Sequence, residues 1–291
     1  MRSKLFVPAS RPDWFGKALA SAADALSFDL EDAVAPDRKD SARADLSRLL
    51  DGRTPCPPEW QAPMRDKTLI VRVNAVGSVH FSADLRACVW PALHLINLPK
   101  VESGDTVRQA AAAIAELERE RGLTRALGLL VNIESPRGLR LVAEIAASHP
   151  RVVGLQIGYG DLFAPLGIAS GEPSATQAVR LAVRLAAGEA GIAAYDGAWV
   201  NFSDGEGFER DCQAARQIVL AVDAGEEQGD RHNKGGPPRG LMKLRQPRRD
   251  PTPCLRLSRA HLPSSRGVRA PMCTRPDLRK KPTRHLNNGQ G

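Results

Sequence analysis

Short apolar runs alternate regularly with amphipathic stretches along residues 1–217. In the amphipathic stretches apolar residues recur at intervals of three and four, which predicts helices over residues 106–121, 138–148 and 177–190. The short apolar runs predict strands over residues 4–7, 25–30, 68–73, 94–98, 126–133, 152–157 and 193–200. Repeated strand-then-helix units indicate a parallel sheet, either doubly wound or closed as a (β/α)8 barrel.

Two observations favour the barrel. No glycine-rich dinucleotide fingerprint follows the first predicted strand. Polar residues follow many of the strands, rather than gathering at one crevice. We therefore predict an α/β domain over residues 1–217, a TIM (β/α)8-type barrel that is incomplete at its eighth strand. Residues 218–223 are the candidate for a short eighth strand.

Residues 218–291 differ sharply from the predicted barrel. Residues 1–217 hold 25 basic and 27 acidic residues, a net charge of −2, whereas residues 218–291 hold 16 and 6, a net charge of +10. The second part also holds 9 of the 22 prolines and few aliphatic clusters, so we predict a disordered Arg/Pro-rich tail. The basic excess lies in this tail, and binding of nucleic acid is expected only there, if at all.

The chain shows no sign of a membrane or an oxidising compartment. It has no run of eighteen apolar residues, and its first residues, MRSKLFVPAS, lack the apolar stretch of a signal peptide. The five cysteines form no zinc-type pattern with the scattered histidines, so we expect reduced thiols. We predict a cytoplasmic protein with no membrane partner.

Charged and amide residues two positions apart follow four of the predicted strands. Side chains at this spacing point the same way on a strand, and barrel enzymes place their active sites at the carboxyl ends of strands. The pairs predict one ring of alternating charge, completed by Asp161 after the next strand: Asp29 with Glu31, Arg72 with Asn74, Lys100 with Glu102, and Asn132 with Glu134.

Within this ring, Glu134 and Asp161 are the candidate ligands of Mg²⁺, which takes one or two protein carboxylates and leaves its other positions to water and substrate. The alternative is that each acid caps a helix or pairs with an arginine. Arg72 is the candidate donor to a substrate carboxylate or an enolate oxygen, and it also suits neutralising Glu31 or Glu102. Lys100 and Glu102 favour an ion pair over a Schiff base, because an adjacent acid keeps a lysine charged.

Basic residues surround the first predicted strand. Their position suits a phosphorylated or nucleotide-like part of a substrate, and ordinary surface charge is the alternative. They are Arg2, Lys4, Arg11 and Lys17.

Several separated motifs, in order over residues 2–216, resemble the HpcH/HpaI aldolase family, in particular the citrate lyase beta-subunit-like proteins with malyl-CoA and citramalyl-CoA lyases. The matching segments are RSKLFVPASRPDWFGKALASAADALSFDLEDAVAPDRKDSAR, VRVNAVGS, LPKVES, VNIESPRGL, GLQIGYGDLFAPLG and AAYDGAWVNFSDGEGFERDCQAAR.

The resemblance implies a TIM barrel that binds Mg²⁺ and cleaves or forms a carbon–carbon bond beside a carboxylate. It implies a homo-oligomer, a trimer or hexamer, with an acyl-CoA or a 2-oxo or hydroxy acid as substrate. By motif matching it implies that Glu134 and Asp161 hold the metal, and that Glu134 and Arg72 bind the substrate. Arg72 is also an implied catalytic residue, with Glu31 and Asp32, which line the site, and Lys100 and Glu102, which support it. The basic segment of Arg2, Lys4, Arg11 and Lys17 is implied to meet coenzyme A.

The chain departs from this family after Arg216. The family's GF-x-GK and IHP-like motifs are absent, and no residue matches the acidic catalytic residue of the C-terminal extension. We hypothesise that a barrel sequence is read out of frame, or fused, beyond codon 216, which translation of the other two frames would test. A barrel without its eighth strand leaves exposed edges, so we expect marginal stability and weak activity. Cooperative melting above about 50 °C would contradict this expectation.

Three functions remain open at this stage. The first is a Mg²⁺-dependent lyase of citryl-, malyl- or citramalyl-CoA. The second is a 2-oxo-acid aldolase that needs no coenzyme A, which would act equally on the free acid. The third is a catalytically impaired remnant whose basic tail binds anions or nucleic acid, with a salt-sensitive gel shift as its signature.

Overall fold

A computed structural model describes residues 1, 3–199, 201 and 203–219 of the chain. The contacts of the backbone divide the chain into two units, Met1–Ser258 and Arg259–Gly291, and every described residue lies in the first. The predicted tail lies outside the described residues except for Ile218 and Val219. The division between residues 217 and 218 therefore stays a prediction.

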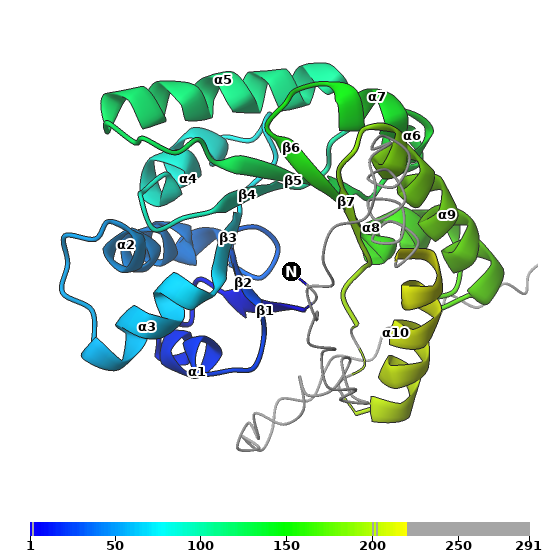
Figure 1. Ribbon diagram of the computed structural model, residues 1–291, viewed down its shortest axis with the longest axis horizontal. Helices are drawn as coiled ribbons and strands as arrows, with labels where there is room; N and C mark the ends of the chain where they lie inside the picture. The colour runs from blue at the N-terminus through cyan, green and yellow to red at the C-terminus, as the bar shows by residue number, and fades with distance from the viewer. Residues whose placement is uncertain (2, 200, 202, 220–291) are drawn as a thin grey trace, which may run out of the picture. The chain divides into compact units, whose positions relative to one another are not determined.

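The described residues form one sheet of seven parallel strands in sequence order, each paired with the next along the chain. Figure 1 shows the strands in a curved row from β1 to β7, with the helices around the outside. This arrangement confirms the predicted parallel, barrel-type fold. The strands are β1 (Lys4–Pro8), β2 (Ala25–Asp29), β3 (Thr68–Arg72), β4 (Leu95–Leu98), β5 (Gly128–Ile133), β6 (Val152–Ile157) and β7 (Ala193–Tyr195).

The helices follow the strands and cover the outer face of the sheet. Most of the buried apolar side chains lie in one large core between these helices and the sheet, while Ala25, Ile70 and Leu130 form a small cluster of their own. The helices are α1 (Phe15–Leu19), α2 (Lys39–Leu50), α3 (Pro58–Asp66), α4 (Phe81–Cys88), α5 (Gly104–Glu120), α6 (Pro136–Arg140), α7 (Val142–Ala147), α8 (Tyr159–Phe163), α9 (Pro173–Glu189) and α10 (Gly205–Val219), with 3-10 turns at Pro12–Trp14, Pro36–Arg38 and Ala164–Leu166.

Side-chain caps start two helices soon after their strands end. The Ser103 hydroxyl accepts the Thr106 N–H at the start of α5, and the Ser135 hydroxyl accepts the Gly138 N–H at the start of α6. Each cap satisfies a backbone donor that the first turn of a helix leaves without a partner. The connections after β4 and β5 are therefore short and fixed, and these connections carry several predicted site residues.

The structure differs from the sequence predictions at three places. The helix predicted over residues 138–148 is two helices that meet at Leu141, and β7 is three residues long instead of eight. The predicted short strand over residues 218–223 is wrong at its start, because Ile218 and Val219 continue helix α10. Its other residues lie outside the described part, and the described residues contain no eighth strand.

Two further predictions, on membrane-spanning helices and on the state of the cysteines, can be compared with the described residues. No helix among them is long and apolar enough to cross a membrane. No disulfide joins the described cysteines, while Cys254 and Cys273 lie outside that part of the chain.

Candidate active site

Arg72 and Asp29 form a two-pronged ion pair at the carboxyl end of the sheet. They are register partners, the last residues of β3 and β2. Arg72 Nε donates to Asp29 Oδ1 at 2.8 Å, and Nη2 donates to Oδ2 at 2.6 Å. The Asp29 carboxylate also accepts the backbone N–H groups of Glu31 and Ala33. The arginine is thereby fixed in one orientation.

Glu31 is buried beside the same arginine. Its oxygens lie 3.1 Å from Arg72 Nη1 and 2.8 Å from Lys100 Nζ. Neither contact has the alignment of a hydrogen bond, so the pairing is ionic. Burial raises the pKa of Glu31 to about 7, even though both cations act in the opposite direction. Glu31 is therefore a carboxyl group that exchanges a proton near neutral pH.

Lys100 connects the acids after β2 with the acid after β5. Its ammonium contacts Glu31 and, at 3.4 Å, Asp32, while its backbone N–H donates to Glu134 Oε1 at 2.5 Å. Its φ of 53° lies in the left-handed region, alone among the described non-glycine residues. Such a backbone costs free energy and persists where surrounding contacts require it.

The predicted ion pair of Lys100 with Glu102 is wrong. The left-handed backbone turns the lysine toward the acids after β2, and Glu102 instead accepts a hydrogen bond from the Ser135 hydroxyl at 2.7 Å. Strand β4 ends at Leu98, so the two-residue alternation of a strand does not extend to these positions.

Glu134 lies at the end of β5 and is held by a chain of amides. Asn97 Nδ2 donates to Asn132 Oδ1 at 2.7 Å, and Asn132 Nδ2 donates to Glu134 Oε2 at 3.0 Å. Gly158 leaves the room that this carboxylate occupies, since a Cβ atom there would overlap it. Burial raises the pKa of Glu134, and the nearby charge of Asp161 acts in the same direction.

Asp161 lies on helix α8, just after β6, and is exposed. Its negative charge acts on both Glu134 and Lys100, so the structure places the two predicted metal ligands near one another. Among the described residues no group of three or more His, Cys, Asp and Glu side chains is arranged around a metal position. Two carboxylates nevertheless suit Mg²⁺, which takes its other ligands from water and substrate, and a dication would offset their mutual repulsion.

The structure does not gather the basic residues of the N-terminal segment. Lys4 donates from inside the sheet's curve to Gln156 Oε1 and lies 4.2 Å from the Phe6 ring. Burial, with the positive charge of Arg72, lowers the pKa of Lys4 to about 7. Arg11 pairs with Asp13 on the exposed turn after β1, and Lys17 is exposed on α1. Arg2 lies outside the described residues.

Asn74, predicted to point with Arg72, belongs to a different cluster. Its amide donates to Asp84 Oδ2 and to the Leu30 carbonyl, and its oxygen accepts from Lys39 Nζ. Strand β3 ends at Arg72, so its alternation does not extend to Asn74, which braces the segments after β2 and β3 instead of lining the site.

The sequence did not predict Asn97 as part of the site, nor the pairing of Asp29 with Arg72. Asp29 was included in the acidic cluster, but its role as the two-pronged partner of Arg72 emerges from the register of β2 and β3. Asn97 of β4 is the register partner of Arg72 in β3, and its sequence context indicated a role. A polar residue in the middle of an apolar strand indicates a buried hydrogen-bonding position.

Comparison with known proteins gives a consistent result. Residues 2–225 match the family model described as HpcH/HpaI aldolase/citrate lyase. The chain is 34% identical over 242 residues to L-malyl-CoA/beta-methylmalyl-CoA lyase of Cereibacter sphaeroides, covering 76% of this chain and 73% of that protein. It is 33% identical over 223 residues to citrate lyase subunit beta of Haemophilus influenzae, covering 75% and 72%.

A solved structure is similar in fold as well as in sequence. Protein CitE from Mycobacterium tuberculosis, in complex with magnesium, acetoacetate and coenzyme A, superposes with a TM-score of 0.59 at 32% identity. The similarity covers 75% of this chain and 75% of that one.

Proposed function

The chain belongs to the HpcH/HpaI aldolase/citrate lyase family, and from that premise we propose that it is a Mg²⁺-dependent carbon–carbon lyase. Its proposed substrate is a hydroxyacyl-CoA thioester such as malyl-, citramalyl- or citryl-CoA. The relatives support this class, because they are named as lyases of such thioesters and as citrate lyase subunits. The CitE structure with magnesium, acetoacetate and coenzyme A supports the cofactor and the ligand class.

The main support for the proposal is that two carboxylates are connected to a network of charged side chains at one edge of the sheet. Glu134 and Asp161 are the residues that would hold the metal, and Lys100 connects them to Glu31 and Arg72. Bound there, Mg²⁺ would bind substrate oxygens and withdraw electron density from them.

In the cleavage direction the substrate hydroxyl loses its proton, and the bond between its carbon and the thioester α-carbon breaks. The electron pair of that bond stays on the α-carbon as an enolate. The enolate then takes up one proton, so the products are a 2-oxo acid and a shorter acyl-CoA. The chain must therefore stabilise a developing negative charge and move protons.

We assign these two tasks to Arg72 and Glu31. Arg72 is fixed by Asp29 and presents a permanent positive charge at the edge where the enolate would form. Glu31 has a pKa of about 7, and a proton-transfer group is most effective near the working pH. Lys100 and Asp32 complete the ring of charge around Glu31.

Two further properties belong to the proposal. Arg11 and Lys17 remain candidates for the coenzyme A moiety, because both lie beside the loop after β1. A trimer or hexamer in the cytoplasm is the proposed form, and light scattering of the purified chain measures its mass directly.

The test is turnover of malyl-, citramalyl- and citryl-CoA and of the matching free acids by the full chain with Mg²⁺. Release of a 2-oxo acid from a thioester, but not from its free acid, is the expected result. Equal turnover of the free acid would favour the aldolase without coenzyme A. No turnover of any compound would overturn the proposal and favour a catalytically impaired remnant.

A further inference from the structure

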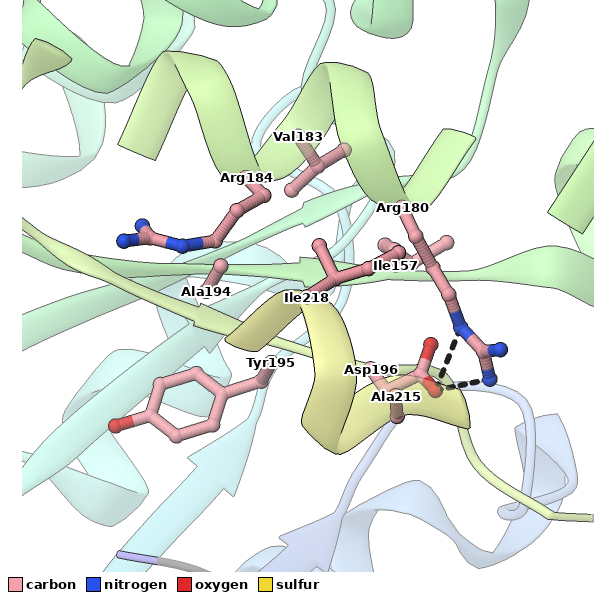
Figure 2. A pocket seen from close by; sticks show the side chains of 9 residues that line it. All are labelled: Ile157, Arg180, Val183, Arg184, Ala194, Tyr195, Asp196, Ala215 and Ile218. Carbon is pink, nitrogen blue, oxygen red and sulfur yellow. Dashed lines mark hydrogen bonds and ion pairs between the residues drawn. The ribbon is translucent and has the colours of Figure 1, made fainter. Parts of the chain in front are cut away.

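A second polar cluster lies beside β7, apart from the network around Arg72. Tyr159 Oη donates to Asp196 Oδ1 at 2.7 Å, and Arg180 Nε donates to Asp196 Oδ2 at 3.0 Å. Arg180 Nη2 also donates to Asp211 Oδ1 at 2.6 Å. Figure 2 shows Arg180 of α9 reaching across to Asp196, which follows β7. Four side chains from four segments are thus joined through one nearly buried guanidinium.

Tyr159 is held at both its hydroxyl and its ring. Its ring lies 5.4 Å from the Phe163 ring, centroid to centroid. On its other side the ring packs so closely against Gly197 that a Cβ atom there would overlap it. Asp196 Oδ1 also accepts the Gly197 N–H at 2.9 Å, which fixes the acceptor of the tyrosine hydroxyl. The Tyr159 side chain is therefore held at both ends by direct contacts.

Tyr159 begins the short helix that carries Asp161. Helix α8 has five residues and no side-chain cap at its start, and a helix of this length has little stability of its own. Asp161 is exposed, so its position depends on the helix backbone. The fixed tyrosine is therefore the anchor of the segment that presents this carboxylate to Glu134.

We propose that Tyr159 is a positioning residue for Asp161, and that Asp196, Arg180 and Asp211 connect the metal-holding edge to helix α10. This inference rests on the proposed function, because it takes Asp161 as a metal-holding residue. It also makes metal affinity depend on α10, the last described helix, through the contact between Arg180 and Asp211.

The test is Mn²⁺ binding to the full chain, measured from the electron paramagnetic resonance signal of free Mn²⁺, with no substrate present. Tyr159→Phe removes the hydroxyl and keeps the ring. Loss of a residue that holds a metal ligand in place weakens metal affinity by about tenfold or more. We expect Tyr159→Phe to bind Mn²⁺ about tenfold more weakly than the wild type. Asp211→Asn should weaken it by a smaller factor, since Arg180 keeps its contact with Asp196.

The matched control is Tyr195→Phe. Tyr195 is also half-buried, but its hydroxyl points away from Arg180 and Asp196 (Figure 2). The Mn²⁺ affinity of Tyr195→Phe should equal that of the wild type. Glu134→Gln should abolish Mn²⁺ binding, which would show that the ion measured in the wild type is bound at this site.

The outcomes separate the two claims. No Mn²⁺ binding by the wild type, or unchanged binding in Glu134→Gln, overturns the proposed metal site. Wild-type affinity in Tyr159→Phe, with binding lost in Glu134→Gln, overturns the positioning role and leaves the proposed function standing. If Tyr159→Phe lowers the melting temperature more than Tyr195→Phe does, the Mn²⁺ affinity of Asp211→Asn is the deciding measurement. An affinity equal to that of the wild type would then contradict the proposal.

Discussion

The edge formed by β2 to β5 and the side formed by β7 and α10 are built in contrasting ways. At the first, each strand pairs with a neighbour on both sides, and the charges of Arg72 and Lys100 are offset by acids in direct contact. At the second, β7 has three residues and pairs only with β6 among the described residues. Arg180 of α9 joins Asp196, after β7, to Asp211 of α10 through two ion pairs. Arg72, Glu31, Lys100 and Glu134 therefore lie on the side with fully paired strands, whereas Asp161, which follows β6, lies on a helix joined to the other side through Tyr159.

The largest effect is expected from Glu134→Gln. Loss of this carboxylate should lower kcat/KM on the order of a thousandfold, since a metal contributes several kcal/mol to stabilising the transition state. Stability should fall by no more than about 1–3 kcal/mol, because the glutamine nitrogen would face one of the two donors that Glu134 accepts, while burial favours an uncharged side chain. Activity assays and thermal melting check both parts. A large fall in melting temperature would contradict the separation of chemistry from stability.

The next effect is expected from Arg180→Met. The substitution leaves Asp196 and Asp211 without their shared cation. Because both carboxylates are partly exposed, the cost should stay below about 3–5 kcal/mol, which is the cost of breaking a fully buried pair. The control is Arg108→Met, which removes an exposed pair with Asp105 and should change stability by about 0.5 kcal/mol or less. Urea denaturation measures both. Equal midpoints for the two variants would show that the β7 side is held by other contacts.

The smallest effect concerns pH and Glu31. The folded state raises the pKa of Glu31 from 4.5 to about 7, so between these values the folded chain binds the proton more tightly than the unfolded chain. The contribution of this group to stability is therefore full below pH 4.5 and falls as the pH rises through 7. Glu31→Gln removes this dependence. Its melting temperature should rise relative to wild type between pH 5 and pH 8, and a constant or falling difference would contradict the assignment.

The strands were predictable because each is an apolar run closed by polar residues. Val152–Ile157 was predicted to the residue, and Lys4, Ala25 and Thr68 were predicted as first residues of their strands. The pair Asn132 and Glu134 was also predicted, since the chain keeps the direction of β5 through both positions. The proximity of Glu134 and Asp161 was predictable because acids after neighbouring parallel strands come together, and their role as metal ligands stays a prediction.

The failures share a physical cause. Lys100 leaves strand geometry through a left-handed backbone, and Asn74 lies two residues beyond the end of β3, so alternation by two does not apply to either. The cluster around Arg180 had no local signal, because its partners are 16 to 37 residues apart in the sequence and meet only when α9, β7 and α10 pack. Contacts of this kind follow from tertiary packing and not from spacing along the chain.

We propose that the edge holding Glu134 and Asp161 performs Mg²⁺-dependent cleavage of an acyl-CoA. The most direct measurement is 2-oxo acid release from malyl-, citramalyl- and citryl-CoA by the full chain as Mg²⁺ is titrated, with Asp161→Asn alongside. We expect release that rises to saturation with Mg²⁺, stops with EDTA, and requires at least about tenfold more Mg²⁺ in Asp161→Asn. Release that is independent of Mg²⁺, or an identical titration in the variant, would contradict the account.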